Sequence, residues 1–154
     1  MRGSGHAEAR VDELSEGKIG RNDIGCSDPI MILKKGKVFI MKDRLFLLKP
    51  GFFDQGKGPY FCPGCAFVEG MLSFYPGLRD KIEINYIDFT RPRPSLVAEI
   101  GEENQGCPKL ILGGSHPVPQ RVTVKEAKGR RFISEPSEIC HYLASAYGFG
   151  EPHD

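Results

Sequence analysis

The sequence lacks the charge excess, long apolar segments and regular cysteine framework that mark several large classes of protein. Its 154 residues include 21 basic and 20 acidic side chains, and the net charge is +1. Such a balance offers no electrostatic basis for binding nucleic acid or an anionic membrane surface. No apolar run approaches the length that spans a bilayer, and the N-terminus shows no signal-peptide core. We therefore expect neither nucleic-acid nor membrane partners.

The cysteines are odd in number and unevenly spaced. There are five of them: Cys26, Cys62, Cys65, Cys107 and Cys140. A small secreted domain that relies on disulfides would instead show an even set at regular spacings. We therefore predict a reducing environment and a cytoplasmic location.

The first forty residues differ from the rest of the chain. They open with Met-Arg-Gly-Ser, which is typical of an expression-vector leader, and continue as polar sequence with weak periodicity. Leader segments are excluded from reasoning about the fold. We expect residues 1–40 to be a vector-derived or flexible leader and residues 41–154 to form one domain. The alternative is a native extension in which residues 31–33 and 38–40 pair as a hairpin.

From Met41 onward, short apolar strands alternate with amphipathic helices. Strands are expected at 45–48, 82–89, 109–112, 121–125 and 130–133, and helices at 63–75, 95–100 and 134–147. A glycine- and proline-bearing loop is expected over 51–60, and Ser134 is the expected N-cap of the last helix. This alternation predicts an α/β fold with a mixed sheet.

One motif carries most of the functional information. Cys62-Pro63-Gly64-Cys65 lies where the loop gives way to the helix expected at 63–75. A lone CxxC serves redox couples and zinc sites alike, but a structural zinc site usually needs a second ligand pair, and the sequence has no second CxxC and no HxxxH. At a helix start, the unpaired amides and the helix dipole stabilise a thiolate on the first cysteine. We therefore predict that Cys62 is the catalytic nucleophile and that Cys65, about one turn further on, is the more buried resolving thiol.

A second motif places Pro108 immediately before the strand expected at 109–112. Together with the CPGC helix, this arrangement resembles the thioredoxin-like superfamily, and the CPxC form is nearer to glutaredoxins than to thioredoxins. The resemblance implies a central mixed four-stranded sheet flanked by helices. It also implies a cis-proline at Pro108 that faces the CPGC motif, with Cys107 and Pro108 binding substrate.

Residues 131–144 resemble the end of the N-terminal domain of glutathione transferases. This resemblance implies that Glu135 holds the glutamyl end of glutathione, although Pro136 stands where that family has serine. The chain also resembles a bacterial domain-of-unknown-function family numbered 3088, which belongs to the thioredoxin-like superfamily. The resemblance is carried by residues 45–52, 62–65, 101–105 and 147–149 and implies a fold without implying a reaction.

Three classes of function remain open at this stage. The first is a thiol–disulfide oxidoreductase that acts on protein or small-molecule disulfides, with glutathione as a candidate cofactor. The second is a metal or iron–sulfur protein that uses Cys62, Cys65 and Cys107 as ligands. The third is a redox-inert adaptor that keeps the fold and uses its surface.

Overall fold

The computed structural model describes residues 32–33, 37–38 and 41–153. Along the chain the elements are β1 Ile32–Leu33, β2 Lys37–Val38, β3 Arg44–Leu48, β4 Phe52–Asp54, β5 Lys57–Tyr60, α1 Pro63–Phe74, the 3-10 turn η1 Pro76–Asp80, β6 Glu83–Ile87, α2 Pro94–Ile100, η2 Glu102–Asn104, β7 Lys109–Ile111, β8 Lys125–Ala127, β9 Arg130–Ile133 and α3 Pro136–Tyr147. Within these residues, no helix is long and apolar enough to cross a membrane.

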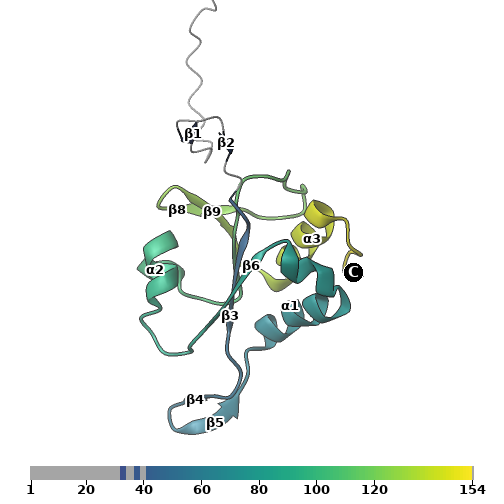
Figure 1. Ribbon diagram of the computed structural model, residues 1–154. Helices are drawn as coiled ribbons and strands as arrows, with labels where there is room; N and C mark the ends of the chain where they lie inside the picture. The colour runs from purple at the N-terminus through teal and green to yellow at the C-terminus, as the bar shows by residue number, and fades with distance from the viewer. Residues whose placement is uncertain (1–31, 34–36, 39–40, 154) are drawn as a thin grey trace, which may run out of the picture.

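Five strands form the central sheet in the order β6-β3-β7-β9-β8 (Figure 1). Strand β3 runs parallel to β6 and antiparallel to β7, and the remaining pairs are antiparallel. The α/β class with a mixed sheet is therefore confirmed. The sheet has five strands rather than four, because β8 pairs with β9 as an added edge strand. This strand begins at Lys125, four residues later than the sequence predicts.

Helices cover both faces of the sheet: α1 and α3 lie on one side and α2 on the other (Figure 1). Side chains alternate along β3, so that Leu45 and Leu47 enter the larger core cluster with α1 and α3, while Phe46 enters the smaller one with α2. The continuous apolar run of β3 is thus buried on both faces, as the sequence predicts.

A buried carboxylate ties the start of β3 to α3. Asp43 is fully buried and accepts hydrogen bonds from the Tyr142 hydroxyl at 2.8 Å, the Tyr147 hydroxyl at 3.0 Å and the Gly113 amide at 2.6 Å. Three donors compensate the loss of water around this carboxylate. The network lies at the N-terminal end of β3, whereas the CPGC motif follows its C-terminal end.

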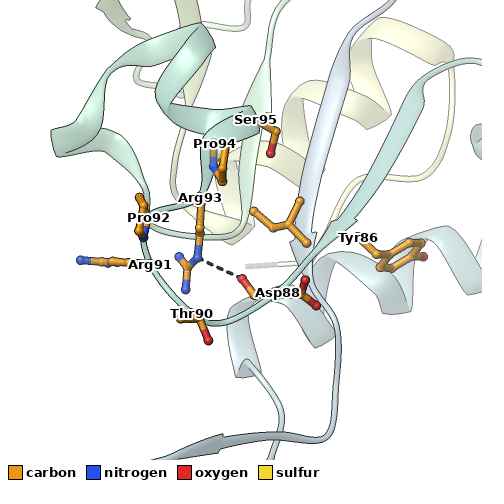
Figure 2. Close-up of a pocket in the computed structure, with 9 residues that line it drawn as sticks. Tyr86, Asp88, Thr90, Arg91, Pro92, Arg93, Pro94 and Ser95 are labelled. Carbon is orange, nitrogen blue, oxygen red and sulfur yellow. Dashed lines mark hydrogen bonds between the residues drawn. The ribbon is translucent and has the colours of Figure 1, made fainter.

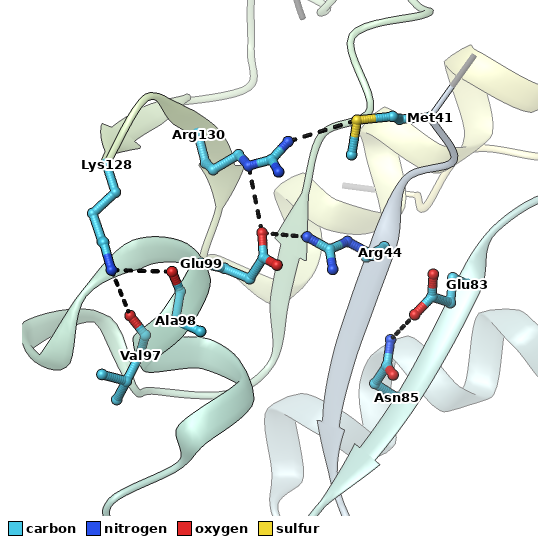
Figure 3. Close-up of polar contacts among 9 residues, drawn as sticks. All are labelled: Met41, Arg44, Glu83, Asn85, Val97, Ala98, Glu99, Lys128 and Arg130. Atoms are coloured by element: carbon cyan, nitrogen blue, oxygen red, sulfur yellow. Dashed lines mark hydrogen bonds and ion pairs between the residues drawn. The ribbon is translucent and has the colours of Figure 1, made fainter. Parts of the chain in front are cut away.

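Ion pairs hold α2 against the sheet (Figure 3). Glu99 on α2 pairs with Arg44 of β3 and, at 3.4 Å, with Nε of Arg130 on β9. The Lys128 ammonium donates to two carbonyls at the end of α2, those of Val97 and Ala98. These contacts fix the helix that precedes the Cys107 segment.

Two local predictions are wrong. The segment predicted as a loop over 51–60 contains a hairpin, in which β4 pairs with β5 and projects beyond the end of the central sheet (Figure 1). Its turn uses the left-handed backbone of Gln55 and Gly56. The N-cap of α3 is Glu135 rather than Ser134, because the Ser134 hydroxyl accepts a hydrogen bond from Lys109 at 2.9 Å instead of capping the helix.

Near the N-terminus, β1 and β2 pair with each other in a separate two-stranded sheet. This is the hairpin of the alternative interpretation, over Ile32–Leu33 and Lys37–Val38. The leader predicted for residues 1–40 otherwise lies outside the described residues. The division of the chain at residue 41 therefore stays a prediction.

Candidate functional site at the CPGC turn

The CPGC motif lies where β5 ends and α1 begins. Cys62 is the N-cap of α1, with φ −84° and ψ 114°, and its sulfur accepts a hydrogen bond from the Cys65 amide at 3.2 Å. Pro63 occupies the first turn, where its missing amide hydrogen leaves no bond unmade. The Cys62 sulfur thus lies where the helix amides stabilise negative charge that develops during sulfur exchange.

Cys65 is the more deeply buried of the two cysteines, with 4% of its surface exposed against half-burial for Cys62. Its sulfur accepts a hydrogen bond from the Leu48 amide at 3.4 Å. Burial, followed by the hydrogen bond to Cys62, raises the pKa of the Cys65 thiol to about 12. Cys65 is therefore a neutral thiol near neutral pH and has to lose its proton before it can attack a disulfide.

Gly64 brings two other segments to the motif. A Cβ built at this position would lie 2.9 Å from Pro136 Cγ and 3.0 Å from Pro108 Cδ. The start of α3 and the segment before β7 therefore both pack against the CPGC turn. Only glycine fits here without displacing one of the two proline rings.

Cys107 also lies beside the motif. The Cys107–Pro108 peptide bond is cis, as the resemblance implies, and the Cys62 thiol is 3.7 Å from the Cys107 carbonyl oxygen that accepts its hydrogen bond. Cys107 is half-buried, and burial raises the pKa of its thiol to about 11. The structure thus brings Cys62, Cys65, Cys107 and Pro108 together, which is the arrangement that the resemblance implies.

Two buried cations lie near Cys107. Arg93, 5% exposed, donates to the carbonyl oxygens of Asp88, Phe89 and Gln105. Lys109, 6% exposed, donates to the Ser134 hydroxyl. All of these acceptors are uncharged oxygens.

These cations act on the Cys107 thiol. Arg93, Lys109 and the exposed Arg91 each lower the pKa of Cys107 and so partly offset the effect of burial. Arg91 and Arg93 also line a pocket of about 570 Å³ between the end of β6 and the start of α2. In Figure 2 the Arg93 side chain reaches the Asp88 carbonyl, whereas Arg91 points outward.

A mostly apolar hollow of about 250 Å³ opens beside the two motif cysteines. Its lining residues come from the end of β3, the segments on either side of the β4–β5 hairpin, the first two turns of α1, and β6. They are Leu47, Leu48, Pro50, Phe61, Cys62, Cys65, Ala66, Glu69 and Tyr86. Phe61 is 62% exposed, and the Glu69 carboxylate pairs with Arg79 and accepts from the Tyr86 hydroxyl at 2.7 Å. The sequence analysis did not identify Phe61, Glu69 or Tyr86 as residues of the site. The position of Phe61 next to Cys62 and of Glu69 one turn after Cys65 were available signals, but nothing in the sequence places Tyr86.

The β4–β5 hairpin does not form part of this lining. The ring of Phe52 instead stacks on Phe89, with centroids 4.3 Å apart. Pro50 and Phe61, which lie just outside the hairpin, do line the hollow.

The remaining candidates lie at different distances from the motif. Glu135 is exposed and is the N-cap of α3, but its side chain makes no capping hydrogen bond. It directly precedes Pro136, which packs against Gly64. Cys140 is buried in the core with α1 and α3. Cys26 lies outside the described residues.

All four cysteines that the structure describes are free thiols. Over residues 41–153, no three His, Cys, Asp or Glu side chains group as a metal site.

A family model described as "Protein of unknown function (DUF3088)" matches residues 42–151, so the chain belongs to this family. Comparisons with curated proteins and with solved structures found no match. The family description names no reaction, and the function is therefore argued from the site itself.

Proposed function

We propose that this member of the DUF3088 family is a thiol–disulfide oxidoreductase with a thioredoxin-like fold. The observation that carries the proposal is the hydrogen bond at 3.2 Å from the Cys65 amide to the Cys62 sulfur. It places a half-buried thiol at a helix N-terminus with a second thiol one turn away, which is the arrangement that a reversible dithiol needs.

The topology supports the fold assignment. The first four strands of the sheet run in the order β6-β3-β7-β9, with β3 and β6 parallel and the connection between them made by α1. The CPGC motif then opens the helix that follows the first strand of this unit, and Pro108 packs against Gly64 of the motif. This is the order of elements that the resemblance to thioredoxin-like proteins implies.

The chemistry follows from the two thiols. The Cys62 thiolate attacks one sulfur of a substrate disulfide, forms a mixed disulfide and expels the other substrate sulfur as a thiolate. Cys65 then loses its proton and attacks the Cys62 sulfur, which forms the Cys62–Cys65 disulfide and releases the second substrate thiolate. The protein dithiol is oxidised by two electrons and the substrate disulfide is reduced by two. A small thiol such as glutathione serves as the reductant that regenerates the dithiol.

The surroundings of Cys62 suit a disulfide carried on a peptide or a small molecule. The Cys107 carbonyl faces the Cys62 sulfur at 3.7 Å, so main-chain groups next to Pro108 lie within reach of an extended substrate segment. The hollow beside Cys62 adds the exposed ring of Phe61, which can pack on the apolar part of a substrate. Glu135 lies at the start of α3, where it can contact the amino group of a glutamyl substrate such as glutathione.

A redox titration of the anaerobically purified protein tests this proposal. We expect two hydrogens to be lost reversibly from wild-type protein, with the link mapped to Cys62 and Cys65 by mass spectrometry. Cys62→Ser is expected to abolish the reduction of bis(2-hydroxyethyl) disulfide, and Cys140→Ala, which changes a thiol buried elsewhere, serves as the matched control. The proposal fails if the pair stays reduced across the titration or if oxidation links Cys62 only to Cys26 or Cys140.

Thiol counting and metal analysis on the same sample separate the two other classes. A redox-inert adaptor shows free thiols at every potential. A protein that holds a metal or an iron–sulfur cluster shows bound metal, with visible absorbance in the case of a cluster.

A further inference from the structure

A third thiol lies close enough to Cys62 to take part in disulfide exchange. The Cys62 sulfur is 3.7 Å from the Cys107 carbonyl oxygen. Because the carbonyl oxygen and the Cα of one residue are about 2.4 Å apart, the Cα of Cys107 lies within about 6 Å of the Cys62 sulfur. The Cys62 sulfur is about 2.8 Å from its own Cα, so the two Cα atoms are at most about 9 Å apart. Disulfide-linked residues have Cα atoms about 4.4–6.8 Å apart, so this bond requires the Cys107 segment to move toward Cys62 by at most a few ångströms.

We propose that Cys107 is a second resolving thiol, so that the oxidised site exchanges between a Cys62–Cys65 and a Cys62–Cys107 disulfide. This inference rests on the proposed function and adds a residue to its chemistry. It gives a role to a thiol that a CxxC mechanism leaves unused.

The exchange is a balanced isomerisation. The Cys107 thiolate attacks the Cys62 sulfur, the Cys62–Cys107 bond forms, the Cys62–Cys65 bond breaks, and Cys65 leaves as a thiolate that takes up a proton. No electrons are gained or lost overall. The same attack on a mixed disulfide at Cys62 expels the substrate thiolate, so that Cys107 can also complete the two-electron reduction without Cys65.

The electrostatic surroundings favour Cys107 in this competition. Arg93, Lys109 and Arg91 stabilise a Cys107 thiolate, whereas the one interaction that lowers the pKa of Cys65 is the amide of Leu48. Burial dominates at both sites and leaves the pKa at about 11 for Cys107 and about 12 for Cys65.

Arg93 and Lys109 are available for this role because their hydrogen bonds go to uncharged oxygens. Arg93 bonds to backbone carbonyls and Lys109 to the Ser134 hydroxyl. These acceptors do not neutralise the positive charge of either side chain. The Glu135 carboxylate acts on Lys109, and a thiolate at Cys107 adds a further compensating negative charge.

The test removes the first resolving thiol. Cys65→Ser protein is reduced, treated with bis(2-hydroxyethyl) disulfide, quenched with acid at intervals and mapped by mass spectrometry. We expect a transient adduct at Cys62 that gives way to a Cys62–Cys107 link, at a rate that rises about tenfold per pH unit below pH 9. Cys65→Ser/Cys107→Ser is expected to stop at the adduct, and Cys65→Ser/Cys140→Ala is expected to behave like Cys65→Ser.

The inference is overturned if Cys65→Ser stops at the adduct just as the double variant with Cys107→Ser does. Cys65→Ala is run in parallel, because alanine suits the apolar surroundings of this buried position if serine disturbs folding. The failure of the proposed function looks different: in that case neither wild-type protein nor Cys65→Ser forms an adduct at Cys62.

Discussion

The Cα of Gly64 faces the ring of Pro108 so closely that a Cβ at position 64 would lie 3.0 Å from Pro108 Cδ. On its other side, the same Cβ would lie 2.9 Å from Cγ of Pro136. The glycine of the CPGC motif is therefore the point at which α1, the start of β7 and the start of α3 meet. The position of Cys62 relative to Cys107 depends on this close packing.

We expect Gly64→Ala to lower the free energy of unfolding by about 1–3 kcal/mol, because the added methyl group displaces one of the two proline rings. It is also expected to slow disulfide exchange. Chemical denaturation and a small-disulfide reduction assay measure these effects. Gly70→Ala is the matched control: Gly70 lies in the same helix with open space around it, and alanine there is expected to stabilise the protein by about 0.5–1 kcal/mol. Equal effects of the two substitutions would contradict the packing argument.

Alkylation is expected to label Cys62 well before Cys65. Burial and the hydrogen bond to Cys62 raise the pKa of Cys65 to about 12, so Cys65 stays protonated at pH 8. A time course with iodoacetamide, read by peptide mass spectrometry on the reduced protein, checks the order. Cys140, which is also buried, is the internal control and is expected to react slowly. Faster labelling of Cys65 than of Cys62 would reverse the assigned roles.

The same shift predicts a loss of stability at alkaline pH. The pKa of Cys65 is raised from 9.0 to about 12 on folding, so the folded state binds this proton more tightly than the unfolded chain does. The resulting stabilisation is fully present below about pH 8 and is lost as the pH rises from about 9 toward 12. Wild-type protein is therefore expected to lose stability more steeply over this range than Cys65→Ser, which has no thiol to ionise. Denaturation at a series of pH values measures this difference. Equal losses of stability in the two proteins between about pH 9 and 12 would argue against the burial effect.

The Asp43 network is expected to contribute to stability and not to thiol chemistry. Tyr142→Phe removes one of three donors to a fully buried carboxylate and is expected to lower the free energy of unfolding by about 1–3 kcal/mol. Tyr147→Phe is expected to cost less, because its hydroxyl is only partly buried. The rate of disulfide exchange is expected to stay unchanged in both variants, since Asp43 lies at the opposite end of β3 from the cysteines. A loss of exchange at unchanged stability would contradict this separation.

Local signals in the sequence were sufficient to predict α1 and strand β3. The apolar spacing after Pro63 and the continuous apolar run at Leu45–Leu48 each specify an element without help from distant residues. The placement of Cys107 near the motif came from a resemblance, and the structure brings the two together.

Other features depend on contacts that no local pattern encodes. The β4–β5 hairpin needs a left-handed backbone at Gln55, and Phe52 is held by stacking on Phe89, which is distant in sequence. Serine is a favoured N-cap residue, but the Ser134 hydroxyl instead accepts a hydrogen bond from the buried ammonium of Lys109. Tyr86 reaches the hollow because β6 pairs with β3, which is a long-range contact. Apart from the turn at Gln55, each of these features is determined by a contact with a residue distant in sequence.

The domain boundary expected at residue 41 can be tested by truncation. Among the residues that the structure describes, the five strands of the central sheet lie between 44 and 133, and both core clusters begin at Leu45. Strand β1 pairs with β2 rather than with this sheet. A chain that begins at Met41 is therefore expected to unfold at the same temperature as the full-length protein and to keep its disulfide exchange. The matched control begins with an initiating methionine before Arg44 and so lacks Asp43. It is expected to lose several degrees, because the Gly113 amide and the two tyrosine hydroxyls lose their shared acceptor. If the Met41 chain loses as much as this control, residues before 41 contribute to the stability of the domain and the boundary is misplaced.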